Sequence, residues 1–138
     1  MGFKGRPQDA GRGVEATTVF LNVDLDLEGP ANLAPLVRAL GPVDILHQSD
    51  AAPFVAHLEI DQVGLDCLAT ISALLDLVEG LAPDARALWD QCTTRSFNIG
   101  IQSGLAPHYS EYALPATLLS RLAAVGADAV VTIYGARQ

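Results

Sequence analysis

The sequence predicts an α+β domain in which helices cover one face of a mainly antiparallel sheet. Three observations lead to this prediction. Four segments alternate apolar and polar residues with the period of two that is typical of half-buried strands. Three others repeat apolar residues at the spacing of a helix, and glycine or proline separates most of the segments. Because each strand has one apolar side, we expect one face of the sheet to pack against helices and the other to meet water.

The first half of the chain contains three predicted strands and one helix. Val19, Leu21, Val23, Leu25 and Leu27 alternate with polar residues and Phe20, and Gly29-Pro30 ends the pattern. A helix follows with Asn32 as its N-cap and ends at Gly41. The expected elements are a strand over 18–27, a helix over 32–40, a short edge strand over 42–48 and a strand over 54–61.

The second half begins with a helical pattern over 65–92, which Gly80 and Pro83 either kink or divide into two helices. The chain is completed by a strand over 95–102, a loop over 104–113, a helix over 115–125 with Pro115 at its first position, and a strand over 128–135.

The first six elements match the split βαβ pattern of a ferredoxin-like domain, which a C-terminal helix and strand extend. We expect residues 1–16 to be a disordered tail and residues 17–138 to form a single domain.

Composition and charge narrow the classes of partner. A net charge of −8 would repel phosphate backbones and anionic membranes, so we expect no nucleic acid and no membrane. The same field allows a basic protein or a cation.

No apolar run spans a bilayer and no secretory signal is evident, which predicts a cytoplasmic protein. Two cysteines in helical sequence, Cys67 and Cys92, are expected to be buried free thiols.

The C-terminal part resembles a small bacterial family of unknown function. The resemblance is carried by FNIGIQSG, a polar loop, and LPATLLSRLAAVGADAVVTIYG, in which Tyr134 occupies the terminal tyrosine position of the family. Relatives often have a glycine and a tryptophan around the second main strand. The stretch HQSDAAPFVAHLEI has neither. The resemblance implies an α+β fold and supplies no catalytic residue, cofactor or partner.

The polar side of the sheet is the first candidate binding site. Asn22, Asp24 and Asp26 share one side of the first strand, and His57, Glu59 and Asp61 share one side of another. Asn98 has the corresponding place on the strand over 95–102. Carboxylate and imidazole groups of this kind can bind a divalent cation. Their spacing matches no metal motif, however, so we predict no metal site. The alternative is an ordinary solvated face.

The loop over 102–112 is the second candidate, because His108, Tyr109, Glu111 and Tyr112 cluster in a segment that should be exposed. Exposed tyrosines often anchor protein contacts. The alternative is a structural loop whose tyrosines cover the sheet edge or a helix end.

No nucleophile elbow, phosphate loop or dinucleotide fingerprint occurs, so we expect neither an enzyme nor a cofactor. The leading prediction is a non-enzymatic module that binds a protein, for example an immunity-like protein that masks a basic partner. The alternative is a regulatory domain that binds a metal or a small molecule between the sheet and the C-terminal loop. Self-association as a homodimer is expected either through the apolar part of the open face (Phe20, Val55 and Val130) or by edge pairing.

Overall fold

The computed structural model describes residues 17–136, which form an α+β domain. The predicted tail over 1–16 lies outside the described residues. The elements in chain order are β1 (Val19–Gly29), α3 (Ala34–Leu40), β2 (Val43–Gln48), β3 (Phe54–Ile60), α4 (Cys67–Glu79), α5 (Pro83–Gln91), β4 (Thr94–Gln102), α6 (Ala116–Ala124) and β5 (Asp128–Tyr134).

The strands form one five-stranded mixed sheet in the order β2-β3-β1-β4-β5. Three of the four neighbouring pairs are antiparallel, and β4 pairs with β5 in parallel because α6 carries the chain back between them. Leu25 of the central strand β1 lies opposite Leu58 of β3 and Phe97 of β4. All three side chains are fully buried, so this row marks the side of the sheet that the core occupies.

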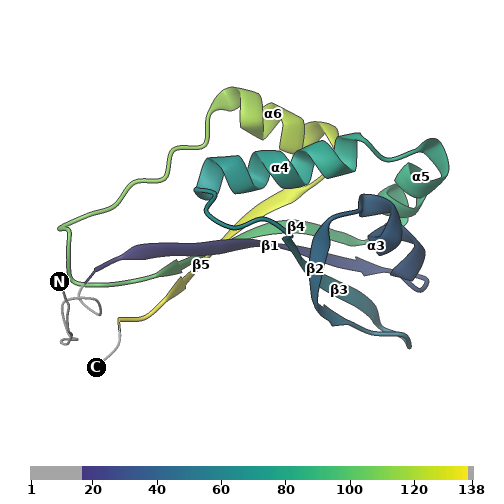
Figure 1. Ribbon diagram of the computed structural model, residues 1–138, viewed down its shortest axis with the longest axis horizontal. Helices are drawn as coiled ribbons and strands as arrows, with labels where there is room; N and C mark the ends of the chain where they lie inside the picture. Colours follow the sequence, from purple (N-terminus) through teal and green to yellow (C-terminus); the bar gives the residue numbers. More distant parts are fainter. Residues whose placement is uncertain (1–16, 137–138) are drawn as a thin grey trace.

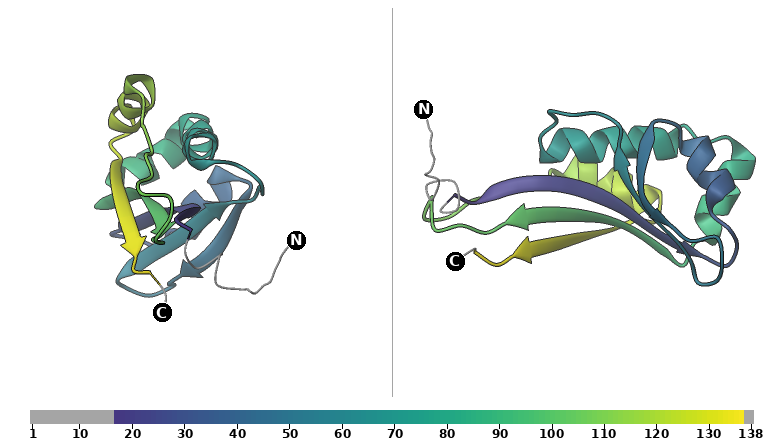
Figure 2. Two further views of the ribbon diagram at one scale, coloured as in Figure 1. Left: turned by 90° about the vertical axis from the view of Figure 1, so that its left-hand side faces the viewer. Right: turned by 60° about the horizontal axis from the view of Figure 1, so that its bottom comes forward.

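The four helices of residues 17–136 lie on one side of the sheet, and none of these residues covers the other side (Figure 1). The prediction of a mostly antiparallel sheet with helices on one face is therefore confirmed. The core fills the space between the layers, where α4 presents Ile71, Leu74, Leu75 and Val78, each with no exposed surface. The start of β1 and the ends of β4 and β5 extend past α4 and α6 (Figure 2).

The helical segment over 65–92 is two helices, since Gly80–Ala82 separates α4 from α5. Asp66 caps α4 by accepting a hydrogen bond from the backbone N–H of Ala69 at 2.8 Å. Trp89 of α5 is fully buried, and its indole N–H donates to the carbonyl of Val125 at 2.8 Å. This bond ties α5 to the end of α6.

Arg95 joins the ends of both helices to the sheet. Its guanidinium donates to the carbonyls of Cys92 and Gly126 at 2.6 and 2.9 Å, and more weakly to those of Trp89 and Asp90. A cation at helix C-termini is favourable because the free carbonyls there carry partial negative charge. Cys67 and Cys92 are buried and free, as predicted, and burial raises the pKa of both thiols.

Three predicted details are wrong at element ends. Helix α3 begins at Ala34 with Leu33 as its N-cap, although the Asn32 side chain still accepts a bond from the Ala34 N–H at 2.8 Å. Pro115 is the N-cap of α6 and not its first helical residue. Strand β1 continues through Gly29, because Glu28 and Gly29 still pair with β3. None of these differences changes which face a side chain occupies.

One further difference changes the side of the sheet on which residues lie. A bulge at Leu21 interrupts the pairing of β1 with β4, so that Phe20 lies opposite Ile101 and Asn22 lies opposite Gly100. The extra residue reverses the alternation toward the start of β1. The sequence predicts Phe20 on the uncovered face, and this prediction is wrong. Phe20 packs against the core.

Among residues 17–136, none of the helices has both the length and the apolar character required to cross a bilayer.

Candidate functional site

The uncovered side of the sheet, called the open face below, gathers most of the predicted site residues. It consists of the strand residues whose register places them opposite the core side. These are Val19, Asn22, Asp24, Asp26, Glu28, Asp44, His47, Val55, His57, Glu59, Thr94, Ser96, Asn98, Gly100, Gln102, Asp128, Val130, Thr132 and Tyr134.

Charge is segregated between the two sides of the sheet. The open face carries six carboxylates, namely Asp24, Asp26, Glu28, Asp44, Glu59 and Asp128, and none of its residues is a lysine or an arginine. The arginines within the described residues are Arg38, Arg86, Arg95 and Arg121. Three lie on helices, and Arg95 lies opposite the buried Leu27, on the core side of β4. The open face is therefore anionic without internal neutralisation by arginine or lysine.

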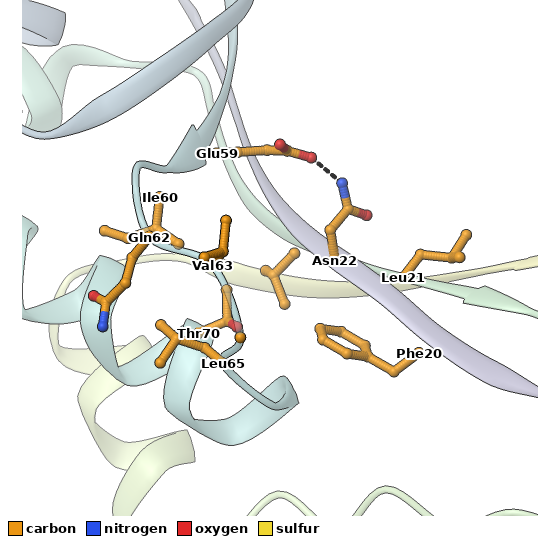
Figure 3. Close-up of a pocket in the computed structure, with 11 residues that line it drawn as sticks. Phe20, Leu21, Asn22, Glu59, Ile60, Gln62, Val63, Leu65 and Thr70 are labelled. Atoms are coloured by element: carbon orange, nitrogen blue, oxygen red, sulfur yellow. Dashed lines mark hydrogen bonds between the residues drawn. The ribbon is translucent and has the colours of Figure 1, made fainter.

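The centre of the open face is a hydrogen-bonded group of Asn22, Asp24 and Glu59. The Asn22 amide donates to Asp24 Oδ1 at 3.0 Å and also to Glu59 Oε2 (Figure 3). The sequence placed Asp24 and Glu59 on the same side of two strands, and the pairing of β1 with β3 brings them together. Asn22 was recognised as part of the polar side, but its role as the bridge between two carboxylates depends on this pairing.

The Asp24 carboxyl holds its proton unusually tightly. Its pKa is raised from the ordinary 3.8 to about 6, first by burial and then by the negative charges of Glu59 and Asp26, and a hydrogen bond to Glu59 acts in the same direction. The nearby His57 lowers the pKa only partly. The charge of the Asp24 carboxyl therefore changes between about pH 5 and 7.

A second pair lies one step along the same strands. Asp26 and His57 are directly opposite each other, and His57 Nδ1 is 2.7 Å from Asp26 Oδ1. The His47 ring on the edge strand β2 lies 5.8 Å from that of His57. These side chains make a row across β2, β3 and β1. Alternation predicts the polar side for Asp26 and His57, but it does not predict that His47 joins them.

Asn98 lies opposite Asp24 in the sheet, but its side chain is hydrogen-bonded to the neighbouring strand on the other side, β5. Thr132 of β5 donates a hydrogen bond from its hydroxyl to Asn98 Oδ1 at 2.8 Å. Asn98 thus borders the acidic group and links it to β5.

The structure does not unite the predicted loop residues with the open face. His108 and Tyr109 contact each other edge to face at 6.3 Å, and Tyr109 is 70% exposed. Tyr112 instead lines a groove of about 360 Å³ on the core side of the sheet, with Ile99, Ile101 and Ile133. The loop and the sheet face are therefore two separate candidate surfaces.

A smaller cavity, of about 250 Å³, lies where β3 ends and the chain turns toward α4 (Figure 3). Phe20, Val63, Leu65 and Thr70 line its apolar side, while Asn22 and Glu59 line the side nearest the open face. This cavity was not predicted, because it depends on the bulge that turns Phe20 toward the core. It gives the Asn22–Glu59 pair an apolar neighbour.

Within residues 17–136, no three histidine, cysteine, aspartate or glutamate side chains are arranged to hold a metal ion.

Comparison of the chain with protein-family models, with curated proteins and with solved structures finds no match. The resemblance to a small bacterial family therefore stays a prediction from the sequence, and functional inference depends on the geometry above.

Proposed function

We propose that the protein is a non-enzymatic binding module that recognises a basic protein through its open face. The observation that supports this proposal is the separation of charge, with six carboxylates and neither lysine nor arginine on the open face and all the described arginines elsewhere. Complementary potentials steer partners together and select among them.

The arrangement of the carboxylates supports the same proposal. Like charges on adjacent strands destabilise a sheet. The pKa of Asp24 is raised first by burial and then by the negative charge of Glu59, so repulsion is one part of the cost of this arrangement. A lysine or arginine from a partner, placed between these two groups, would remove the repulsion. A guanidinium suits the position best because it donates to two carboxylate oxygens at once.

One version of this module is an immunity-like protein that masks a basic toxin, which the negative charge of the open face favours. We also infer that β1 to β4 with α3 and α4 form a ferredoxin-like unit that α6 and β5 extend. The antiparallel order β2-β3-β1-β4 within the sheet supports that inference.

The test uses a fluorescent lysine- and arginine-rich peptide as the probe of a basic partner. We compare the Asp24→Asn/Glu59→Gln variant with Asp84→Asn/Asp90→Asn, which removes the same charge from α5 on the helical side. Anisotropy should show binding that weakens as salt increases and that falls about tenfold in the first variant and less than about twofold in the second. Equal losses in the two variants would show a non-specific charge effect and refute the proposal.

A second candidate function is the binding of a small apolar molecule in the groove between the sheet and the loop before α6. The groove of about 360 Å³ has the size of a ligand pocket, and Tyr112 and Ser110 supply hydroxyl groups beside Ile99 and Leu114. A thermal-shift screen of apolar metabolites tests it, because a ligand of the native state raises the melting temperature. A hit whose shift survives Leu114→Asp would contradict binding in this groove.

A further inference from the structure

We propose that β5 pairs with β5 of a second copy, antiparallel and centred on Val131, to give a dimer with one continuous ten-stranded sheet. The proposal goes beyond the proposed function, because it concerns an edge of the sheet and not the open face.

The first argument is the unpaired backbone of β5. Among the described residues, β4 is the only strand that pairs with β5, so the outer side of Asp128–Tyr134 has no strand partner. Regular pairing with β4 continues over seven successive residues without a bulge. Such an edge is a template for another strand unless something prevents pairing.

The second argument is that β5 lacks the devices that usually protect an edge. It has no proline, lysine or arginine, and its single charge, Asp128, is at one end. The opposite edge strand, β2, has a bulge between Ile45 and His47 and carries Asp44 in its body. Bulges and charges blunt edges, so the contrast favours β5 as the strand that pairs.

The third argument is the exposed apolar surface along β5. Val131 and Ile133 are 54% and 65% exposed on the core side, and Val130 and Tyr134 are 40% and 53% exposed on the open face. The groove lined by Ile99, Ile101 and Leu114 continues this apolar surface on the core side. A partner strand at the edge would cover β5 from both faces.

The fourth argument is that the sequence of β5 complements itself in one direction. Antiparallel pairing about Val131 places Val131 against its copy, Ala129 against Ile133, and Val130 against Thr132. Asp128 then faces Tyr134, and the two Asp128 carboxylates lie ~20 Å apart at opposite ends. A parallel pairing in the same register would instead put the two carboxylates side by side.

The net charge of −8 does not prevent this association. Asp24 on β1 would be separated from its copy by five strand spacings, or ~24 Å, which is about three Debye lengths in physiological salt. The repulsion between the acidic groups is therefore screened, and the local surface of β5 is neutral except at Asp128.

The experiment measures mass by light scattering during gel filtration, from about 1 to about 300 µM, because dimers dissociate on dilution. The wild type should reach twice the 14.5-kDa chain mass. Val131→Lys should stay monomeric at every concentration, since it sets two like charges opposite each other at the centre of the interface. Ile45→Lys is the matched control, because Ile45 is 55% exposed on the other edge strand, and it should dimerise like the wild type. Thermal melts confirm that both variants are folded.

A cysteine variant tests the register independently. Antiparallel partners lie ~4.5–5.5 Å apart at Cα, within the range of a disulfide, so Val131→Cys should form an intermolecular disulfide under mild oxidation well before Ile45→Cys does. The native cysteines are buried and contribute little. A wild type that stays monomeric throughout, an equal loss of dimer in Ile45→Lys, or equal cross-linking of the two cysteine variants would overturn the proposal.

Discussion

Replacing Asp24 with asparagine should stabilise the protein at neutral pH, although it removes a hydrogen-bonded charge. Asparagine resembles the protonated form of Asp24. Its amide oxygen can still accept the hydrogen bond that Asn22 now donates at 3.0 Å, and its N–H can donate to Glu59. The variant therefore keeps the geometry of the open face. It removes the two main causes of the raised pKa of Asp24, which are the burial of its charge and the repulsion from Glu59 and Asp26.

The size of the expected gain in stability follows from the change in the proton affinity of Asp24 on folding. The pKa of Asp24 rises from 3.8 to about 6 on folding, and each tenfold change is worth ~1.4 kcal/mol, which would give ~3 kcal/mol in a fully buried site. Asp24 is only partly buried, so solvent screening reduces the expected gain to ~1 kcal/mol. For a domain of this length that corresponds to a rise of ~3 °C in Tm.

The upward direction of the pKa shift also predicts how the stability gained by Asp24→Asn depends on pH. Because the pKa is higher in the folded state, the protonated Asp24 contributes its full stabilisation below about pH 4, and this contribution is lost as the pH rises through about 6. The wild type should therefore weaken between pH 4.5 and 7.5 relative to Asp24→Asn. The difference between the two proteins should be small at the lower pH.

Urea unfolding at pH 4.5 and 7.5 measures the gain in stability and its dependence on pH. Each curve gives the free energy of unfolding in water and the urea concentration at the midpoint. Asp90→Asn is the control, because it removes one carboxylate from an exposed position on α5 and should give no gain. The reasoning is refuted if Asp24→Asn is no more stable than the wild type at pH 7.5, or if its gain is the same at both pH values.

Three further substitutions test how the helical layer is attached. Trp89→Phe removes the indole N–H and leaves the Val125 carbonyl without its 2.8 Å bond, so urea unfolding should show a loss of ~2 kcal/mol; an unchanged midpoint would contradict this. Arg121→Ala removes the ion pairs from α6 to two acidic residues of α4 and should cost ~1 kcal/mol, less in 0.5 M salt, whereas a salt-independent loss would point to packing. Gly126→Ala should cost ~1–2 kcal/mol in thermal unfolding, because φ is +68° there and the added Cβ would meet a guanidinium nitrogen at 3.0 Å; a neutral result would show that the turn relaxes.

The strands were predictable because alternation reports which side of a strand is buried, whatever its neighbours are. The same signal cannot show a bulge, since Leu21 continues a regular apolar pattern and nothing in that pattern marks it as an extra residue. One sign was available in the partner strand. Gly100 lies opposite the bulge, where a Cβ would come within 3.0 Å of Asn22 Oδ1. A glycine inside a strand often marks such a close approach.

The candidate site was predictable in its residues and not in its connections. Asp24, Asp26, His57 and Glu59 were correctly placed on polar sides, but their pairing depends on which strands are neighbours and in which register. That information is tertiary, because β1 must lie between β3 and β4 for Asp24 to meet Glu59 and Asn98. The loop had no periodicity from which to infer a face, so the groove that Tyr112 lines on the core side was not predicted.

The acidic open face and the edge of β5 are distinct surfaces of one sheet, and this makes the two proposals separable. Asp24 lies two strands from β5, ~10 Å away, where substitutions without shared partners act almost additively. Asp24→Asn/Glu59→Gln should therefore weaken peptide binding about tenfold and leave the dimer intact. Val131→Lys should dissociate the dimer while each monomer binds the peptide with unchanged affinity. If either variant removed both properties, the two surfaces would act as one site, because Asn98, which links the acidic group to Thr132 of β5, would then couple them.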